Sequence, residues 1–255
     1  MPMAGSRRVL ILGGTQEAVD LATRLNAEQG LEVITSFAGV TQNPRLPRGE
    51  TRSGGFGGAD GLATYLREEG VAAVVDATHP YAASISLNAA DAGKATGVPV
   101  LHLTRPAWEM RDGDVWQLAG GPAEAAAWLN ASALPDGAGV LLTTGRSDLA
   151  AYRAVRRLRL IARVVETPNP ECREMLDRLI QDRGPFTLDA ERRLMIDNQV
   201  ACLVSKNSGG TASYPKIEAA RELGLPVVMI RRPAPPPGLC VPSVADVASW
   251  LENLA

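Results

Sequence analysis

The stretch Val9-Leu10-Ile11-Leu12-Gly13-Gly14-Thr15-Gln16-Glu17 decides the fold, because it joins an apolar run to a helical pattern through two glycines. Four apolar residues in a row favour a buried strand of a parallel sheet. The helix that follows would place on one face Ala18, Leu21, Ala22 and Leu25. Glycines at such a turn let a pyrophosphate approach the backbone, and the helix N-terminus supplies N–H donors. The stretch therefore predicts an α/β unit with a nucleotide site; an ordinary tight turn is the alternative, since the full G-x-G-x-x-G pattern is absent.

Strand and helix patterns alternate along the rest of the chain. The expected strands are 9–12, 31–37, 71–76, 100–103, 140–143, 158–165, 200–204 and 227–230. The expected helices are 16–29, 62–69, 82–96, 171–182, 191–198, 214–223 and 244–254. A long loop is expected over residues 42–61, Gly30 is expected to follow the first helix as its C-terminal cap, and Ser147 is expected to cap a helix. This alternation predicts parallel sheets covered by helices.

Two segments of the chain resemble each other. Residues 97–106 and 224–233 both read G-x-P-V-x-x-x-x-R-P, and each is followed by a loop and a helix that ends in Trp-Leu. Gly-x-Pro-Val alone is a common helix-to-strand connection, but the added Arg-Pro and Trp-Leu matches favour two homologous halves. The prediction is an α/β fold of two Rossmann-like parallel-sheet domains with helices on both faces, comprising residues 1–134 and 135–255.

Composition excludes several classes of function. The chain has 255 residues and a net charge of −2, so it lacks the basic field that a nucleic-acid-binding protein uses. The three cysteines form no CxxC pair and there are two histidines, so no metal site is expected. No stretch approaches the roughly 18 apolar residues of a membrane span. These features suit a cytoplasmic protein in a reducing compartment that binds a small molecule, not a membrane or nucleic acid.

The end of the second expected strand bears on the choice of nucleotide. NAD-specific folds place an acidic residue there, about 20 positions after the first glycine. Residues 35–39 contain no carboxylate, and Ser36 offers a hydroxyl instead. The adjoining loop supplies Arg45, Arg48 and Arg52. Hydroxyl and guanidinium groups suit a 2′-phosphate, so the sequence favours NADPH; a solvated basic loop is the alternative.

A second motif, Asp76-Ala77-Thr78-His79-Pro80-Tyr81-Ala82, follows the strand 71–76. Open α/β sheets bind ligands at the carboxyl ends of their strands. His79 could therefore position a cofactor or donate a proton, although a histidine before proline is more often structural.

A third motif, Ser205-Lys206-Asn207-Ser208-Gly209-Gly210, follows the strand 200–204. It combines a cation, polar side chains and a flexible backbone, which together suit an anion. Thr144-Gly145-Arg146 occupies the equivalent place after the strand 140–143. Either motif could be an ordinary turn, but two at one sheet edge favour a carboxylate or phosphate site.

The motifs together resemble the precorrin-6A reductase family of cobalamin biosynthesis, and they stand in the family's order over nearly the whole chain. The stretches that carry the resemblance are 10–18, 76–82, 103–108, 144–146 and 206–210. The resemblance implies two Rossmann-like domains with the active site in the cleft between them. It also implies reduction of precorrin-6A to precorrin-6B by hydride transfer from NADPH, in which the protein supplies positioning and electrostatics.

The motifs and the resemblance together assign residues to roles. The cofactor residues are Gly13, Gly14, Thr15, Glu17, Ser36, Thr78 and His79. The residues for the carboxylates of the tetrapyrrole are Arg105, Arg146, Lys206, Asn207, Ser208, Gly209, Gly210 and Lys216. His79 and Tyr81 are the candidate proton donors, with water as the alternative.

Three other functions stay open at this point. A cobalt-precorrin-6A reductase would share the same motifs. A dinucleotide sensor without catalysis would need only one ligand site. A glycosyltransferase-like protein would bind a sugar nucleotide and not respond to NADPH.

Overall fold

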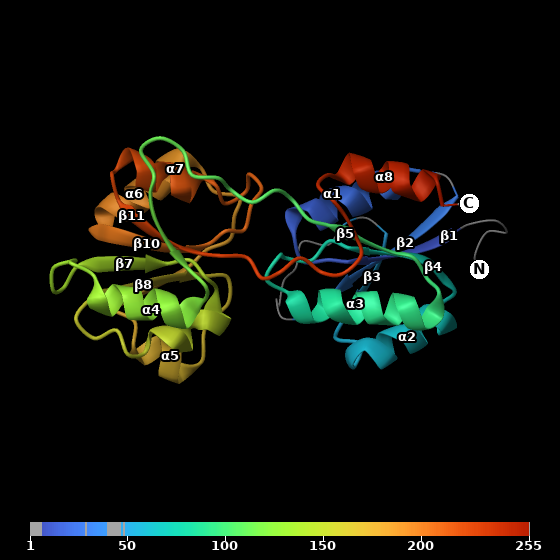
Figure 1. The fold of residues 1–255 in the computed structure, drawn as a ribbon, viewed down its shortest axis with the longest axis horizontal. Helices are drawn as coiled ribbons and strands as arrows, with labels where there is room; N and C mark the ends of the chain where they lie inside the picture. The colour runs from blue at the N-terminus through green and yellow to red at the C-terminus, as the bar shows by residue number, and fades with distance from the viewer. Residues whose placement is uncertain (1–6, 29, 40–46, 48, 255) are drawn as a thin grey trace. The chain divides into compact units, whose positions relative to one another are not determined.

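The computed structural model describes residues 7–28, 30–39, 47 and 49–254, and the chain divides into two compact units. Unit 1 comprises Met1–Pro106 with Pro233–Ala255, and unit 2 comprises Ala107–Arg232. Each unit contains one six-stranded sheet in which every strand pairing is parallel. Helices cover both faces of each sheet (Figure 1). The predicted fold class is confirmed.

Unit 1 is built on a sheet with the strand order β12-β5-β4-β1-β2-β3. Its strands are β1 (Arg7–Leu12), β2 (Leu31–Phe37), β3 (Glu50–Ser53), β4 (Val71–Asp76), β5 (Val100–Leu103) and β12 (Leu239–Val241). Its helices are α1 (Gln16–Leu25), α2 (Gly58–Glu68), α3 (Ala83–Thr96) and α8 (Val244–Glu252). Figure 1 shows α1 and α8 on one face of this sheet and α2 and α3 on the other.

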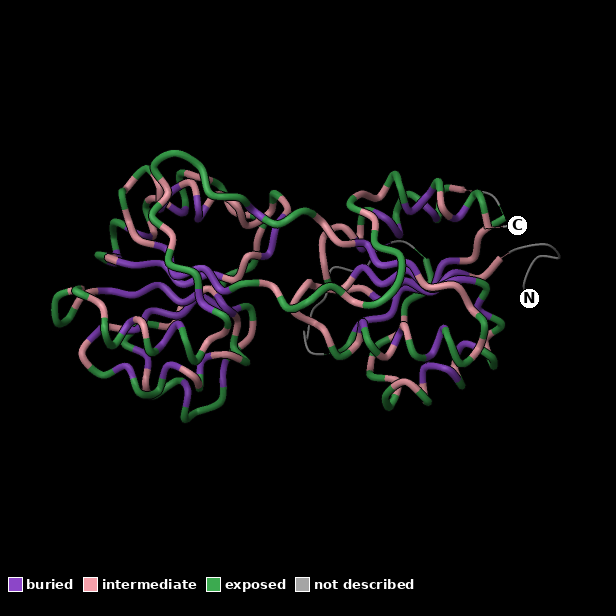
Figure 2. Tube along the Cα trace, viewed as in Figure 1, coloured by how far each residue is buried: buried purple, intermediate pink, exposed green. Residues whose placement is uncertain are grey.

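The apolar run of β1 fills two separate cores of unit 1. Val9 and Ile11 belong to the core under α1 and α8, whereas Leu10 and Leu12 belong to the core under α2 and α3. Successive side chains of a strand point to opposite faces of the sheet, so a strand buried on both faces must be apolar at every position. Figure 2 shows this burial of the central strands.

Unit 2 has the strand order β6-β11-β10-β7-β8-β9. Its strands are β6 (Val115–Ala119), β7 (Gly139–Leu142), β8 (Arg159–Val164), β9 (Arg178–Gln181), β10 (Val200–Lys206) and β11 (Pro226–Ile230). Its helices are α4 (Pro122–Ala131), the 3₁₀ helix η1 (Arg146–Tyr152), α5 (Pro170–Glu174), α6 (Leu188–Asp197) and α7 (Pro215–Glu222). Figure 1 shows α6 and α7 on one face of this sheet and α4 and α5 on the other.

The two units do not follow the predicted boundary between residues 134 and 135. The element pair β6–α4 belongs to unit 2, because β6 pairs along its whole length with β11. The pair β12–α8 belongs to unit 1, because β12 pairs with β5 and α8 adds Val247, Ala248 and Leu251 to the core around α1. Each half of the sequence therefore gives its sixth strand and its last helix to the sheet of the other half. The repeated Arg-Pro marks the two places where the chain crosses, after Pro106 and after Arg232.

The helix predicted over residues 171–182 is wrong beyond its first turn and a half. Helix α5 ends at Glu174, and residues 178–181 form β9, which pairs with β8. Asp177 sets this pairing, because its N–H donates to Leu160 O over 2.9 Å and its carboxylate accepts the Leu160 N–H over 2.8 Å. The pairing with β8 overrides the helical spacing of the apolar residues.

Three smaller expectations also differ from the structure. The loop predicted over residues 42–61 contains β3, which pairs with β2, and the start of α2. Helix α1 ends at Leu25 with Asn26 as its cap, so Gly30 does not cap it. Gly145 is the residue before η1, and no side chain caps that helix, so the expected capping role of Ser147 is wrong.

The exchange of terminal elements predicts where a distant core mutation acts. Leu251 is 3 % exposed and packs in unit 1, so Leu251→Ala should lower the free energy of unfolding by about 2–5 kcal/mol. Hydrogen exchange should then speed up in α1 and β5, which lie far from residue 251 in sequence. The matched control is Leu129→Ala, the corresponding Trp-Leu position, which should speed exchange in β11 and η1 instead. Faster hydrogen exchange in β10 and β11 of the Leu251→Ala variant would contradict the placement of α8 in unit 1.

Candidate functional site

The predicted site residues of each unit gather at one sheet edge. Because all strands in a sheet are parallel, the turns that follow β1, β2, β4 and β5 lie at the same edge of unit 1. The turns that follow β7 and β10 share an edge of unit 2 in the same way.

The glycine turn after β1 combines a tight position with an open one. A Cβ added to Gly13 would lie 3.2 Å from Thr35 Cγ2 and 3.3 Å from Ser36 O, so only hydrogen fits well there. Gly14 has φ +120°, and a Cβ on it would meet no atom within 4 Å. The turn therefore packs closely against β2 on one side and leaves room for a ligand beside Gly14.

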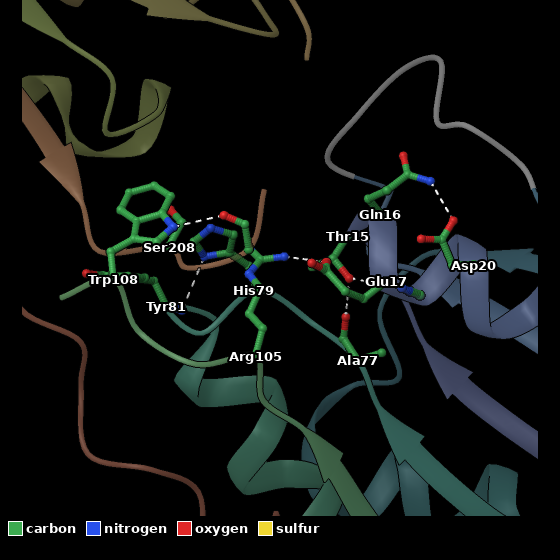
Figure 3. A network of polar contacts seen from close by, with 12 residues as sticks. Thr15, Gln16, Glu17, Asp20, Ala77, His79, Tyr81, Arg105, Trp108 and Ser208 are labelled. Carbon is green, nitrogen blue, oxygen red and sulfur yellow. Dashed lines mark hydrogen bonds and ion pairs between the residues drawn. The ribbon is translucent and has the colours of Figure 1, made fainter. Parts of the chain in front are cut away.

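Thr15 joins the glycine turn to the motif after β4. Its Oγ1 accepts the Ala18 N–H over 3.1 Å and so caps α1, and it donates to Ala77 O over 2.7 Å (Figure 3). One hydroxyl thus fixes both the start of α1 and the backbone just before Thr78.

Arg105 lies with the predicted cofactor residues. Its Nη1 forms an ion pair with Glu17 Oε2, and the two side chains are 15 % and 26 % exposed (Figure 3). A small pocket at this place is lined by Thr15, Glu17, Thr78, Pro80, Leu103 and Arg105. The sequence predicts that Arg105 binds the substrate, and the structure places this residue in unit 1 against the first turn of α1.

Ser36 has a guanidinium beside it. Arg52 Nη1 donates to Ser36 Oγ over 2.7 Å and to Gly54 O over 3.1 Å. The same guanidinium lies 3.8 Å from the centroid of the Phe56 ring, which fixes its plane. Strand β3 brings these groups together, because Ser36 pairs with Arg52 in the sheet. Arg45 and Arg48, the other two predicted arginines, lie outside the described residues.

Asp76 fixes the turn that contains Thr78. Its Oδ1 accepts the Thr78 N–H over 3.1 Å and the Thr78 hydroxyl over 2.6 Å. Burial by itself would raise the pKa of this carboxyl, but hydrogen bonds from His102, Ser86 and Thr78 outweigh it and hold the pKa below its usual value. Asp76 is therefore a buried anion that orients the motif.

His79 has one ring nitrogen occupied as an acceptor. The Tyr81 N–H donates to His79 Nδ1 over 3.3 Å (Figure 3). In the neutral ring the proton then lies on Nε2, and an imidazolium would turn an N–H toward the Tyr81 N–H. This geometry suits His79 as a donor of a hydrogen bond and opposes it as a donor of a proton.

In unit 2, Lys206 is held by a carboxylate. Lys206 Nζ lies 2.8 Å from Asp148 Oδ2, and the side chains are 17 % and 16 % exposed. Next to this pair the side chains of Thr144 and Tyr152 are buried, and burial raises the pKa of the Tyr152 phenol above its usual range. Arg146 is the exposed first residue of η1. The sequence missed Asp148, and the signal was its place two residues after Arg146 in the same turn.

The rest of the predicted anion loop binds the chain's own crossing segments. The side chain of Asn207 accepts the Trp108 N–H over 2.8 Å and donates to Trp108 O over 2.9 Å. Trp108 Nε1 donates to Gly210 O over 2.9 Å. Arg232 donates to the carbonyl oxygens of Asn207 and Ser208 over 2.8 and 2.9 Å. The loop therefore fixes the two segments at which the chain enters and leaves unit 2, a role that the sequence did not indicate.

Gly209 and Lys216, two further predicted substrate residues, lie in the loop after β10 and in α7. Gly209 has φ +67°, a conformation that favours glycine. Lys216 is 4 % exposed, with Nζ 5.6 Å from the centroid of the Trp108 ring. The contact between Lys216 and a substrate carboxylate stays a prediction.

Among the described residues, no three His, Cys, Asp or Glu side chains gather as a metal site would require. No helix in the described part of the chain is long and apolar enough to cross a membrane.

Comparison with known proteins identifies the family. The family model of precorrin-6x reductase CbiJ/CobK matches residues 8–254. The chain is 44 % identical to a precorrin-6A reductase of Rhodococcus erythropolis over 97 % of this chain and 98 % of that protein. It is 31 % identical to a cobalt-precorrin-6A reductase of Priestia megaterium over 96 % of this chain and 98 % of that one. The solved structure of a CobK precorrin-6A reductase superimposes with a TM-score of 0.89 at 39 % identity, covering 98 % of this chain and 97 % of the other. The chain belongs to the precorrin-6x reductase CbiJ/CobK family.

Proposed function

We propose that this chain reduces precorrin-6A to precorrin-6B in cobalamin biosynthesis by transferring a hydride from NADPH. The observation that carries the proposal is the Ser36–Arg52 pair beside the open turn at Gly14, in a chain whose 44 % identical relative is named precorrin-6A reductase. A hydroxyl and an oriented guanidinium at the end of β2 suit a 2′-phosphate. When bound, the nicotinamide supplies the hydride, and the chain supplies binding and orientation.

Unit 1 is assigned to the cofactor. The open space at Gly14 and the N–H groups at the start of α1 suit the pyrophosphate. Glu17 would repel that group, and its ion pair with Arg105 offsets the negative charge. Thr78 and His79 follow β4 at the same edge, where a nicotinamide or ribose can accept their hydrogen bonds.

Unit 2 is assigned to the substrate. Precorrin-6A carries several acetate and propionate carboxylates, and Lys206 and Arg146 are cations at the ligand edge of this unit. Asp148 holds Lys206 in place, so less side-chain entropy is lost when a carboxylate binds.

The proton that completes the reduction is assigned to Tyr81 or to water. His79 Nδ1 accepts the Tyr81 N–H, so a neutral His79 with the proton on Nε2 is favoured. Donation of that proton would leave an imidazolate, which makes His79 a positioning residue in this proposal.

The runner-up is reduction of the cobalt-containing ring. Identity favours the cobalt-free substrate, since the chain is 44 % identical to the precorrin-6A reductase and 31 % identical to the cobalt-precorrin-6A reductase. Anaerobic mixing of the purified protein with NADPH and either substrate decides between them, with the corrin absorption and the NADPH absorption followed together. A nucleotide sensor would bind NADPH and consume none, and a sugar-nucleotide enzyme would not respond to it.

The first prediction concerns selection of the 2′-phosphate. Arg52→Ala should weaken NADPH binding by about 10- to 150-fold, because a hydrogen bond to a charged group contributes roughly 1.5–3 kcal/mol. NADH, which lacks the phosphate, should bind almost as it does to the unaltered chain. Titration of both nucleotides measures the ratio. An equal loss of affinity for NADPH and NADH would show that Arg52 stabilises the loop without contacting the 2′-phosphate.

The second prediction separates the two glycines. Gly14→Ala places a methyl group in the open space, so NADPH binding should weaken strongly with a modest loss of stability from the strained backbone. Gly13→Ala serves as the control, since its methyl group would press on Thr35 and Ser36 and lower the melting temperature more. Calorimetric titration and thermal unfolding give both readouts. Normal NADPH binding by a folded Gly14→Ala variant would place the cofactor elsewhere.

The third prediction concerns Lys206. Lys206→Ala should raise the KM for precorrin-6A by about 10- to 150-fold, while NADPH affinity and kcat stay nearly unchanged. Steady-state kinetics with both substrates varied gives the two constants. Loss of NADPH binding with substrate binding retained would reverse the assignment of the two units.

A further inference from the structure

Unit 1 contains a series of buried hydrogen bonds that connects the C-terminal segment at Pro237 with the proposed cofactor turn at Thr78. His102 on β5 lies with Nδ1 2.9 Å from Asp76 Oδ2 and Nε2 3.2 Å from Pro237 O. The other oxygen of Asp76 accepts the N–H and the hydroxyl of Thr78. His102 and Asp76 are 1 % and 4 % exposed. Three segments of the chain thus meet through one imidazole and one carboxylate: β5, the turn after β4 and the segment at Pro237.

Both neighbours of the His102 ring are acceptors. Asp76 is ionised, because it already accepts two hydrogen bonds from Thr78 and its pKa lies below the usual value. The carbonyl of Pro237 has no proton to give. A neutral ring would direct a lone pair at one of these oxygens, whereas an imidazolium donates to both.

The remaining charged groups near β5 do not change this arrangement. On α3 and α8, the helices that pack on β5, the titratable residues are Asp91, Lys94, Asp246 and Glu252, and all four are exposed. On β12 the residue in register with His102 is Cys240, whose thiol is exposed. Among the described residues, Asp76 is the carboxylate within hydrogen-bond distance of the ring.

The second half of the chain shows that the fold does not need this ion pair. In the repeat, His102 aligns with Met229. Asp76 is the neighbour of His102 on the adjacent strand, and Ser205 is the neighbour of Met229, so Ser205 corresponds to Asp76. Ser205 and Met229 are both 0 % exposed, and β11 still pairs with β10 and receives β6. The same strand arrangement forms there without a charge. Burying a charged pair costs free energy of solvation, so its presence in unit 1 calls for another reason.

We infer that His102 is a buried imidazolium that acts as a positioning residue: through Asp76 it orients the Thr78–His79 turn for the nucleotide, and through Pro237 it fixes the returning segment. This inference rests on the proposed binding of NADPH in unit 1. The charge of His102 keeps Asp76 ionised, and an ionised Asp76 can accept both hydrogen bonds from Thr78. The turn is then set before the nucleotide arrives, which lowers the entropy lost on binding.

The protonation state is tested on the unaltered protein. The chain has two histidines, so ¹⁵N-detected NMR of the imidazoles gives two sets of signals, and the His79→Asn variant assigns them. At neutral pH, both ring nitrogens of His102 should carry protons, whereas His79 should carry one on Nε2. An unprotonated nitrogen on His102 at neutral pH would overturn the inference, whatever the protein does with NADPH.

The positioning role is tested by giving unit 1 the residues of unit 2. The double variant Asp76→Ser/His102→Met should fold, because Ser205 and Met229 support the same strand pairing, and both charges are removed together. Its NADPH dissociation constant should rise about tenfold, equivalent to about 1.4 kcal/mol. The single variant His102→Met leaves Asp76 buried and uncompensated, so it should lose much more stability than the double variant.

The control is Leu251→Ala, which weakens unit 1 without touching Thr78 and should bind NADPH normally where it is folded. Unchanged NADPH affinity in the folded double variant would overturn the positioning role. Failure of the unaltered protein to bind NADPH would instead overturn the proposed function.

Discussion

Parallel pairing of the two exchanged strands is the constraint on which the structure depends. Strand β12 completes the sheet of unit 1 beside β5, and β6 completes the sheet of unit 2 beside β11. Each pairing commits the chain to cross between the units once in each direction. Because every strand pairing in both sheets is parallel, the polar turns that follow the strands of a unit lie at the same edge of its sheet. The motifs at Gly13, Asp76 and Lys206 reach ligand edges for this reason, and the two crossing segments are tied to the same turns.

The cations at these edges are oriented by partners within their own unit. Arg105 pairs with Glu17, Arg52 with Ser36, and Lys206 with Asp148. A long side chain that is already fixed loses less entropy when a ligand anion approaches, and a neighbouring carboxylate keeps the net charge of the edge low. This arrangement fits a chain with a net charge of −2 that is proposed to bind two strongly anionic ligands.

The internal repeat allows one unit to serve as a reference for the other. The segments 97–106 and 224–233 align without a gap, and the strands before them pair in the same register. The buried polar residues nevertheless differ: Asp76 and His102 in unit 1 stand where Ser205 and Met229 stand in unit 2. Conversely, the loop after β10 uses Asn207 to hold the Trp108 backbone. Residues that are alike in the two units are those that the strand arrangement requires. Residues that differ are those that adapt the sheet edge of each unit to its own ligand or chain contact.

The sequence by itself determined the fold class and the positions of most strands, because these depend on local spacing: the apolar run 9–12, the glycine turn and the repeated Arg-Pro are all visible within a few residues. The family followed from the resemblance of the motifs at 10–18, 76–82, 103–108, 144–146 and 206–210. The sequence also predicts Ser36 and Lys206 as site residues. The membership of β6–α4 and β12–α8 could not be determined from local spacing, since a strand of given composition can complete either of two similar sheets. The strand at 178–181 depended on Asp177 meeting β8. The partners of Arg105, Lys206 and His102 lie 88, 58 and 26 residues away in the chain, and only the tertiary structure brings such distant side chains within hydrogen-bond distance.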